Sequence, residues 1–335
     1  MLPLILIFCM LFGFLLTYWI TPWLIRYLYR IELLVQDQHK ENKKLVPVSG
    51  GMAVLLGILA GLMIFIFFRT FFPNTIPISL LEGTDLTLIF AALITIFTIT
   101  FVGFIDDLLI RKSKTSSAGL KQWQKPLLTL AAAVPLMVSQ VGTSVMIVPF
   151  VGHVDFGLFY PLLLVPLAVV IGANMVNMLA GFNGMESGMG IIYMLSLGSY
   201  AYYHGRYTAA IIALVTFAAL TAFYLFNKTP AKIIPGDSGT YLLGAVLVTV
   251  AVLGNLEKAA LIISIPFIIE FILKARGKFQ KVTVGYLENG KIKSHYQKIY
   301  SLPHFFTRTG KYTEKQIVYF MLFMQLIFSG LIWVL

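Results

Sequence analysis

Asp106 and Asp107 are adjacent carboxylates that directly follow the apolar segment Phe101–Ile105 in this chain of 335 residues. If that segment is helical, both lie near its C-terminal end, where the negative end of the helix dipole disfavours an acid without a nearby cation. Two carboxylates in such a place attract a divalent metal ion, or one of them keeps its proton. The alternative is a solvated helix end close to the basic residues Arg111 and Lys112. The pair is therefore a candidate for catalysis.

A second segment with candidate functional residues runs from Asn174 to Gly188 and is rich in asparagine and glycine. Asn174 and Asn177 are three positions apart, so they share one face of a helix. The glycines that follow, Gly181 among them, permit a tight loop that comes close to a bound molecule. Uncharged amides suit metal ligation through oxygen and the reading of a base edge. The alternative is a turn in which these residues serve only the backbone geometry.

Asp237 lies in a third candidate segment, Pro235–Gly239, at the start of an apolar run. An aspartate at the beginning of an apolar helix usually caps the helix by accepting a backbone N–H. The same position suits a metal ligand, because the free N–H groups at a helix N-terminus attract phosphate. One residue is able to fill both roles.

Basic residues between the apolar runs are candidates for binding phosphate. Lys121 and Lys125 share a connection with the aspartate pair, and Lys44 belongs to a basic stretch in the first connection. Each could neutralise a phosphate, whereas a loop lysine more often marks membrane topology or contacts a lipid headgroup. His304 and Arg308 lie near the end of the largest polar segment and are candidate substrate contacts.

The composition places all of these residues in a membrane protein. Hydrophobic residues make up 59% of the chain and charged residues 12%, against about 25% charged in soluble domains. The single cysteine, Cys9, excludes an intrachain disulfide framework and a cysteine-based zinc cluster. Ten apolar runs suit spans across a ~30 Å hydrocarbon core; they are residues 2–28, 51–68, 86–105, 126–148, 158–177, 187–203, 208–226, 239–253, 257–273 and 316–335. We therefore predict an all-α, polytopic membrane protein with one domain over residues 1–335.

The positions of lysine and arginine predict the orientation of these spans. The odd-numbered connections and their flanking helix ends hold 22 of the 25 basic residues, and the even-numbered ones hold 3. Because basic residues collect on the cytoplasmic side, both termini should face away from the cytoplasm, and the net charge of +11 needs no nucleic-acid partner. The polar candidates then gather at the cytoplasmic face, as suits an enzyme that meets a soluble and a lipid substrate. A nucleotide-sugar or ion transporter, the alternative, would place polar residues near the midplane.

The ninth connection, residues 274–315, is the largest polar segment and is expected to be a cytoplasmic substrate-recognition loop. Within it, Asn289 and Gly290 separate the runs Lys281–Leu287 and Lys291–Gln297. Asn-Gly between two such runs favours a type I′ turn, so we predict a small β-hairpin there.

Together, the Asp-Asp, Asn-x-x-Asn and Gly-Asp motifs and the ten spans resemble the polyprenyl-phosphate N-acetylhexosamine-1-phosphate transferase superfamily. The motifs follow the order of that family over nearly the whole chain, and Leu179–Glu186 is similar to its archaeal and eukaryotic branch, the dolichyl-phosphate GlcNAc-1-phosphate transferases. The resemblance implies that Asp106 and Asp107 are the acidic pair needed for activity. It implies Lys125 as a pyrophosphate contact.

The resemblance also implies a magnesium cofactor, replaceable by Mn²⁺, held by Asn177 and Asp237. We expect the nucleotide-sugar to contact seven residues: Asn174, Gly181, Phe182, Asn183, Glu186, His304 and Arg308. We expect the lipid phosphate to contact Lys44 and Lys121.

The reaction that the resemblance implies is transfer of N-acetylhexosamine-1-phosphate, with GlcNAc as the expected sugar, from a UDP-sugar to polyprenyl or dolichyl phosphate. UMP is released, and the product begins N-glycan or surface-glycan assembly. Direct attack by the lipid phosphate is favoured, while a covalent intermediate on Asp106 stays open. Pro303–Arg308 replaces the histidine-rich or arginine-rich motif on which sugar recognition in relatives depends, so the hexosamine stays open. We expect an active site on the cytoplasmic face of an archaeal or bacterial plasma membrane rather than the endoplasmic reticulum. We also expect contact with membrane lipids, and a homodimer is possible.

Overall fold

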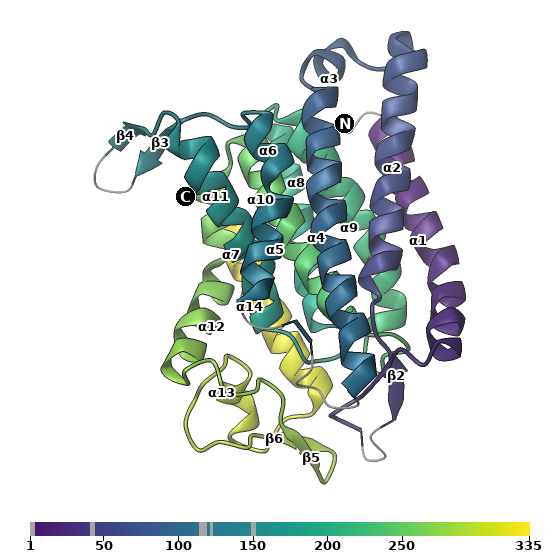
Figure 1. Ribbon diagram of the computed structural model, residues 1–335, viewed down its shortest axis with the longest axis vertical. Coiled ribbons are helices and arrows are strands. Elements are labelled where there is room, and N and C mark those ends of the chain that lie inside the picture. The colour runs from purple at the N-terminus through teal and green to yellow at the C-terminus, as the bar shows by residue number, and fades with distance from the viewer. Residues whose placement is uncertain (1–3, 41–43, 114–118, 121–122, 149–151) are drawn as a thin grey trace.

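The computed structural model describes residues 4–40, 44–113, 119–120, 123–148 and 152–335, which form a bundle of helices with small strand pairs at its ends (Figure 1). Six helices of this described part are long and apolar enough to cross a membrane, which confirms a polytopic membrane protein. They are α1 (Leu4–Arg30), α2 (Gly51–Phe71), α4 (Leu86–Ser113), α7 (Val165–Met178) with the preceding π-helical turn η2 (Tyr160–Leu164), α9 (Tyr207–Asn227) and α10 (Gly236–Gly254). The predicted number of ten spans stays a prediction.

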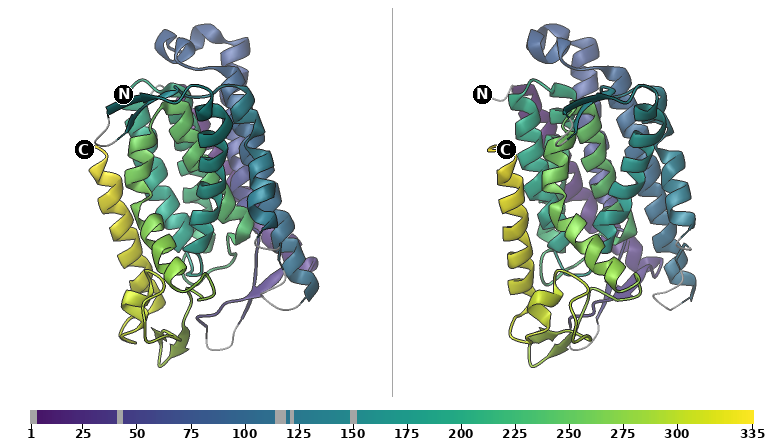
Figure 2. Two further views of the ribbon diagram at one scale, coloured as in Figure 1. Left: turned by 60° about the vertical axis from the view of Figure 1, so that its left-hand side comes forward. Right: turned by 90° about the vertical axis from the view of Figure 1, so that its left-hand side faces the viewer.

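The remaining long helices, α8 (Met185–Tyr203) and α14 (Glu314–Leu331), run beside these six. Helix α1 begins and α14 ends at the same end of the bundle (Figure 2). An even number of passes, as predicted, gives this arrangement. Which end faces the cytoplasm stays a prediction.

Two further passes through the bundle are made by pairs of shorter helices, and proline explains why each is broken. The first pair is α5 (Gln124–Ala132) with α6 (Val134–Val138), and the second is α11 (Glu257–Ile263) with α12 (Ile265–Arg276). The second helix of each pair has proline at one of its first two positions, Pro135 in α6 and Pro266 in α12. Proline lacks the N–H for the preceding turn and clashes with its carbonyl, so a continuous helix is interrupted there.

The predicted span over residues 126–148 was wrong at its C-terminal end. Helix α6 stops at Val138, and β3 (Val145–Val148) pairs with β4 (Gly152–Asp155) in an antiparallel hairpin. Gln140 and Gly142 have φ angles of 47° and 87°, in the left-handed region that ends a helix. The valine-rich residues beyond them favour extended backbone over helix.

The hairpin predicted in the ninth connection is confirmed. Strands β5 (Tyr286–Glu288) and β6 (Lys291–Lys293) pair antiparallel, with Leu287 opposite Ile292. Asn289 and Gly290 both have positive φ, 50° and 74°, as a type I′ turn requires. A second pair, β1 (Leu34–Gln36) with β2 (Leu45–Pro47), lies in the first connection and was not predicted. The shortest helices are η1 (Pro73–Thr75), α3 (Ile78–Glu82) and α13 (His304–Thr307).

Helix α10 lies in the interior of the bundle, where it packs against α4, α7 and α9. Glycine permits two of its close crossings. A Cβ on Gly244 of α10 would lie 1.9 Å from the carbonyl oxygen of Gly172 in α7, and one on Gly103 of α4 would lie 2.5 Å from the carbonyl oxygen of Asp237. The second crossing brings the end of α4, with its two aspartates, against the first turn of α10.

Candidate active site

Lys125 joins two of the three predicted aspartates. Its Nζ lies 2.5 Å from Asp106 Oδ2 and 3.0 Å from Asp237 Oδ2. The three side chains come from the last third of α4, which continues beyond Asp106 to Ser113, and from the first turns of α5 and α10. Asp106 is wholly buried, and its Oδ1 accepts the Leu120 N–H at 2.5 Å. Residues more than a hundred positions apart thus form one charged centre at a single end of the bundle.

Asp107 has a different set of contacts from its neighbour. Its carboxylate accepts hydrogen bonds from Ser49 Oγ at 2.6 Å, from the Asp237 N–H at 2.8 Å and from the Ser238 N–H at 3.2 Å. These two N–H groups belong to the first turn of α10, where a helix has no internal acceptors. Asp107 is 1% exposed and caps α10 from outside its own helix. Asp107 therefore holds the first turn of α10, and with it Asp237, in place; its predicted catalytic role stays a prediction.

A polar cavity of about 320 Å³ opens beside this charged centre. Its lining residues come from the first connection, the asparagine–glycine segment and the start of α10; among them are Gln36, Asp37, Asn177, Gly181, Phe182, Asn183, Glu186 and Asp237. Gly181 has a φ of 135°, and its N–H donates to Glu186 Oε1 at 2.6 Å. Five of the predicted nucleotide-binding and metal-binding residues therefore share one cavity with Asp237.

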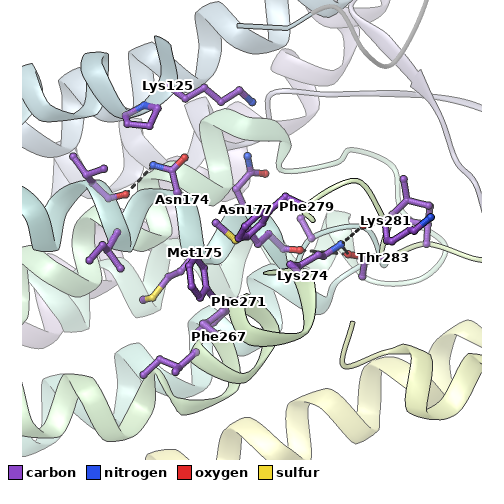
Figure 3. A pocket seen from close by; sticks show the side chains of 18 residues that line it. Lys125, Asn174, Met175, Asn177, Phe267, Phe271, Lys274, Phe279, Lys281 and Thr283 are labelled. Carbon is purple, nitrogen blue, oxygen red and sulfur yellow. Dashed lines mark hydrogen bonds between the residues drawn. The ribbon is translucent and has the colours of Figure 1, made fainter. Parts of the chain in front are cut away.

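Lys125 lines a larger, mostly apolar groove of about 830 Å³ (Figure 3). It runs between α7 and α12 and is lined by Ile171, Met175, Phe267 and Phe271, with lysines at its polar end. A second, almost wholly apolar cavity of about 280 Å³ shares Ile171, Met175 and Ile268 with it and extends along α7. The groove therefore offers a continuous apolar surface that starts at the charged centre.

The polar cavity and the apolar groove meet at Asn177, Ala180 and Val284, which line both. Lys125 lines the groove and Asp237 lines the cavity, so their 3.0 Å ion pair crosses the boundary between them. A phosphate held in the groove and one held in the cavity would therefore meet at this ion pair.

The glycosyl transferase family 4 model matches residues 89–255, a segment that contains Asp106, Asp107, Lys125, Asn177 and Asp237. A relative from Saccharolobus solfataricus is 32% identical over 95% of this chain and 93% of its own. The chain belongs to this family. The relative is named as a candidate UDP-N-acetylglucosamine–dolichyl-phosphate N-acetylglucosaminephosphotransferase, and so is one from Sulfolobus acidocaldarius, 31% identical over 88% of this chain and 85% of its own. A phospho-N-acetylmuramoyl-pentapeptide-transferase from Bacillus licheniformis is 28% identical over 81% of this chain and 82% of its own.

Not every residue predicted from the sequence as a substrate contact lies at the polar cavity. Asn174 lines the apolar groove, and its Nδ2 donates to the Val170 carbonyl oxygen at 2.8 Å within α7. Lys44 and Arg308 are exposed and line neither the groove nor the polar cavity. Lys121 lies outside the described residues. Their predicted substrate contacts stay predictions.

His304, the other predicted substrate contact in the ninth connection, is buried and does not line the groove. Its Nδ1 accepts the Tyr300 N–H at 3.2 Å, and its ring centroid lies 5.6 Å from that of Tyr296. Burial, together with the charge of Lys274, lowers the pKa of His304 to about 4. The residue is therefore neutral at physiological pH and packs inside the connection.

Sequence reasoning missed three charged residues that line the cavities. Asp37 lines the polar cavity, while Lys274 and Lys281 line the groove. Lys274 is buried and donates to Thr283 Oγ1 at 2.6 Å and to the Lys281 carbonyl oxygen at 2.9 Å. Nothing in the local sequence distinguishes them from ordinary loop charges, because their position depends on contacts between distant segments.

Proposed function

We propose that this protein transfers N-acetylglucosamine-1-phosphate from UDP-N-acetylglucosamine to a polyprenyl phosphate such as dolichyl phosphate, with release of UMP. The observation that carries the proposal is the junction at Asn177, where a polar cavity meets an apolar groove beside the Lys125–Asp237 ion pair. The substrates follow the names of the archaeal relatives. The same shape, with a lipid on one side and a nucleotide on the other, suits no single-substrate enzyme.

The nucleotide-sugar is placed in the polar cavity. Phe182 offers a ring, Asn183 an amide, and Gly181 a backbone that a ligand can approach closely because it has no Cβ. The diphosphate would then extend towards Asp237 and Lys125, at the first turn of α10. Lys125 supplies a positive charge there that attracts the phosphate oxygens.

The lipid is placed in the groove, with its phosphate at the Lys125 end and its isoprenoid chain along α7. The apolar side chains Ile171 and Phe271 are 52% and 47% exposed, so an isoprenoid chain would cover apolar surface that water would otherwise contact. In this arrangement the lipid phosphate lies next to the diphosphate. The isoprenoid chain stays on the apolar surface of the groove, and the nucleotide stays in the polar cavity.

In the proposed reaction, one oxygen of the lipid phosphate forms a bond to the β-phosphorus of the donor. The bond from that phosphorus to the oxygen bridging to the α-phosphorus breaks, and UMP leaves with the electron pair. Lys125 holds the two anions together and stabilises charge on the leaving oxygen. Direct attack is favoured because Asp106, the candidate nucleophile, has both carboxylate oxygens engaged, by Leu120 N–H and by Lys125, and lines neither cavity.

A magnesium ion is proposed as cofactor, with Asp237 and Asn177 as its protein ligands. The fit rests on two observations. Asp237 and Asn177 line the same cavity, and the carboxylates of Asp106 and Asp237 already share one cation, the Lys125 ammonium. Carboxylate and amide oxygens are the ligands that Mg²⁺ prefers. Among the described residues, no three acidic, histidine or cysteine side chains converge, so phosphate and water oxygens would complete its coordination. When bound, the ion would neutralise the diphosphate.

We further propose ten membrane spans, with the broken helices α5–α6 and α11–α12 as two of them and α8 and α14 as two more. The charged centre would then face the cytoplasm, where UDP-sugars are made, because 22 of the 25 basic residues lie in connections at that end. The archaeal relatives favour a plasma membrane as its location.

The test is UMP release by purified protein in detergent, supplied with Mg²⁺, polyprenyl phosphate and a panel of UDP-sugars. We expect release only when both substrates are present, with UDP-N-acetylglucosamine as the best donor. Asp237→Ala and Asp106→Asn should abolish release.

Asp155→Asn is the matched control, because Asp155 is an exposed carboxylate in β4 at the opposite end of the bundle. It should leave release unchanged. Binding of nucleotide or lipid without release for any UDP-sugar would contradict the proposal and favour a transporter.

A further inference from the structure

A buried network of charged and polar side chains supports one wall of the polar cavity from behind. Glu314, in the first turn of α14, accepts the Asn183 N–H at 3.0 Å through Oε1, and His39 Nδ1 lies 3.2 Å from the same oxygen. Lys40 Nζ donates to Oε2 at 3.1 Å. Glu314 is only 6% exposed and lines neither the polar cavity nor the groove. Its contacts therefore reach the site only through other residues.

The same network holds the asparagine–glycine loop from a second side. Asn183 Nδ2 donates to Asp37 Oδ2 at 2.8 Å, and the His39 N–H donates to Asp37 Oδ1 at 3.1 Å. The His39 ring lies 4.5 Å from the ring of Phe182. Phe182 and Asn183 line the cavity, so both are fixed by contacts with the first connection and the last helix.

Resting on the proposed function, we infer that Glu314 is a positioning residue that holds Phe182 and Asn183 in the shape that receives the nucleotide of the donor. It acts through the Asn183 N–H and through His39, and it touches no substrate. A charge-assisted hydrogen bond from a backbone N–H holds that peptide group in one orientation. A buried hydrogen bond of this kind stays strong because water does not compete for its partners. Without it, the loop would have to be ordered when the nucleotide binds, and binding would weaken.

The experiment compares Glu314→Ala with Glu314→Gln in the full-length protein. Glu314→Ala should raise the KM for the UDP-sugar about tenfold, as expected when one charge-assisted hydrogen bond is lost, with kcat and the KM for polyprenyl phosphate within about twofold. Glu314→Gln keeps an oxygen acceptor for the Asn183 N–H and should recover most of the loss. The control is Glu288→Ala, because Glu288 is an exposed carboxylate that pairs with Lys293 in the hairpin.

A second pair of variants tests the inference if Glu314→Ala does not fold. His39→Ala removes the partner of both Glu314 and Phe182, whereas His39→Asn keeps a donor near the position of Nδ1. The KM for the donor should rise with alanine and recover with asparagine. Equal losses in both substrates' KM values, without recovery in the conservative variants, would overturn the inference in favour of a purely structural network.

Affinity for UMP alone, measured by calorimetry on the same proteins, separates this inference from the proposed function. If the wild type binds UMP and Glu314→Ala binds about tenfold more weakly, the inference holds even where no transfer is seen. Equal UMP affinity in the two proteins overturns the inference and leaves the transferase intact. A wild type that neither binds UMP nor releases it overturns both.

Discussion

Asp106 and Asp107 are neighbours in sequence, and the structure predicts opposite consequences of mutating them. Asp107 accepts three hydrogen bonds, two from the N–H groups of Asp237 and Ser238 that it caps at the start of α10 and one from Ser49 Oγ. Asp106 instead pairs with Lys125, which keeps Asp237 as a second partner. We predict that Asp107→Ala lowers stability strongly, while Asp106→Asn leaves stability nearly unchanged and removes activity.

The magnitude follows from the donors that Asp107→Ala would leave without an acceptor. Each buried donor left unpaired costs about 1–3 kcal/mol, and loss of a helix cap by itself costs about 0.5–2 kcal/mol. The three contacts share one carboxylate, so we expect a total of about 3–5 kcal/mol, which is in the range of the larger single-site effects. Asp106→Asn removes one of the two carboxylates that pair with Lys125, but the amide oxygen still accepts the Leu120 N–H and Lys125 keeps Asp237 as its counter-ion. The loss should therefore be about 1 kcal/mol.

The assay is thermal unfolding of detergent-purified protein, followed by intrinsic fluorescence, with UMP release measured well below the midpoint. Asp107→Ala should lower the Tm by roughly 5–10 °C. Asp106→Asn should unfold within about 2 °C of the wild type and lose at least about a hundredfold in kcat, because Lys125 loses the carboxylate that holds it at the junction of the two cavities. A stable Asp107→Ala protein whose only defect is a loss of kcat would refute the assignment of Asp107 as the cap of α10.

Three further predictions concern the lipid, the metal and pH. Lys281→Met should raise the KM for polyprenyl phosphate about fivefold and leave the KM for the UDP-sugar unchanged, because Lys281 lines the groove and not the polar cavity. Lys278→Met, at an exposed position outside the groove, should change neither value. Removal of divalent ions with EDTA should stop UMP release, and Mg²⁺ should restore it, with partial recovery by Mn²⁺; release that persists in EDTA would contradict the magnesium proposal. The pKa of His304 falls from 6.5 to about 4 on burial, so the folded protein resists a proton that the unfolded chain binds, and stability should fall as pH drops from about 6.5 towards 4. His304→Asn, which keeps an acceptor for the Tyr300 N–H, should show a smaller drop in Tm between pH 7 and 5, and an equal drop would contradict this role.

Much of the fold and part of the site follow from local sequence patterns, each for a local physical reason. The apolar runs mark membrane helices because the bilayer core solvates only such segments, and six of them meet that description. Asn289-Gly290 predicts its hairpin because few other residues adopt the two positive φ angles of that turn. Asp106, Asn177 and Asp237 are recognisable as candidates because carboxylates and amides that adjoin apolar spans are costly to bury unless they have a polar partner.

What only the tertiary structure decided is which of these residues work together. Adjacent Asp106 and Asp107 have separate roles because α10 meets α4 at Gly103, so that one carboxylate faces Lys125 and the other faces the first turn of α10. Glu314 contacts a loop that lies 131 positions away in the chain, which no local pattern reveals. Hydropathy and turn geometry act over a few residues, and they therefore determine elements. The packing of helices acts between distant residues, and it therefore determines the site.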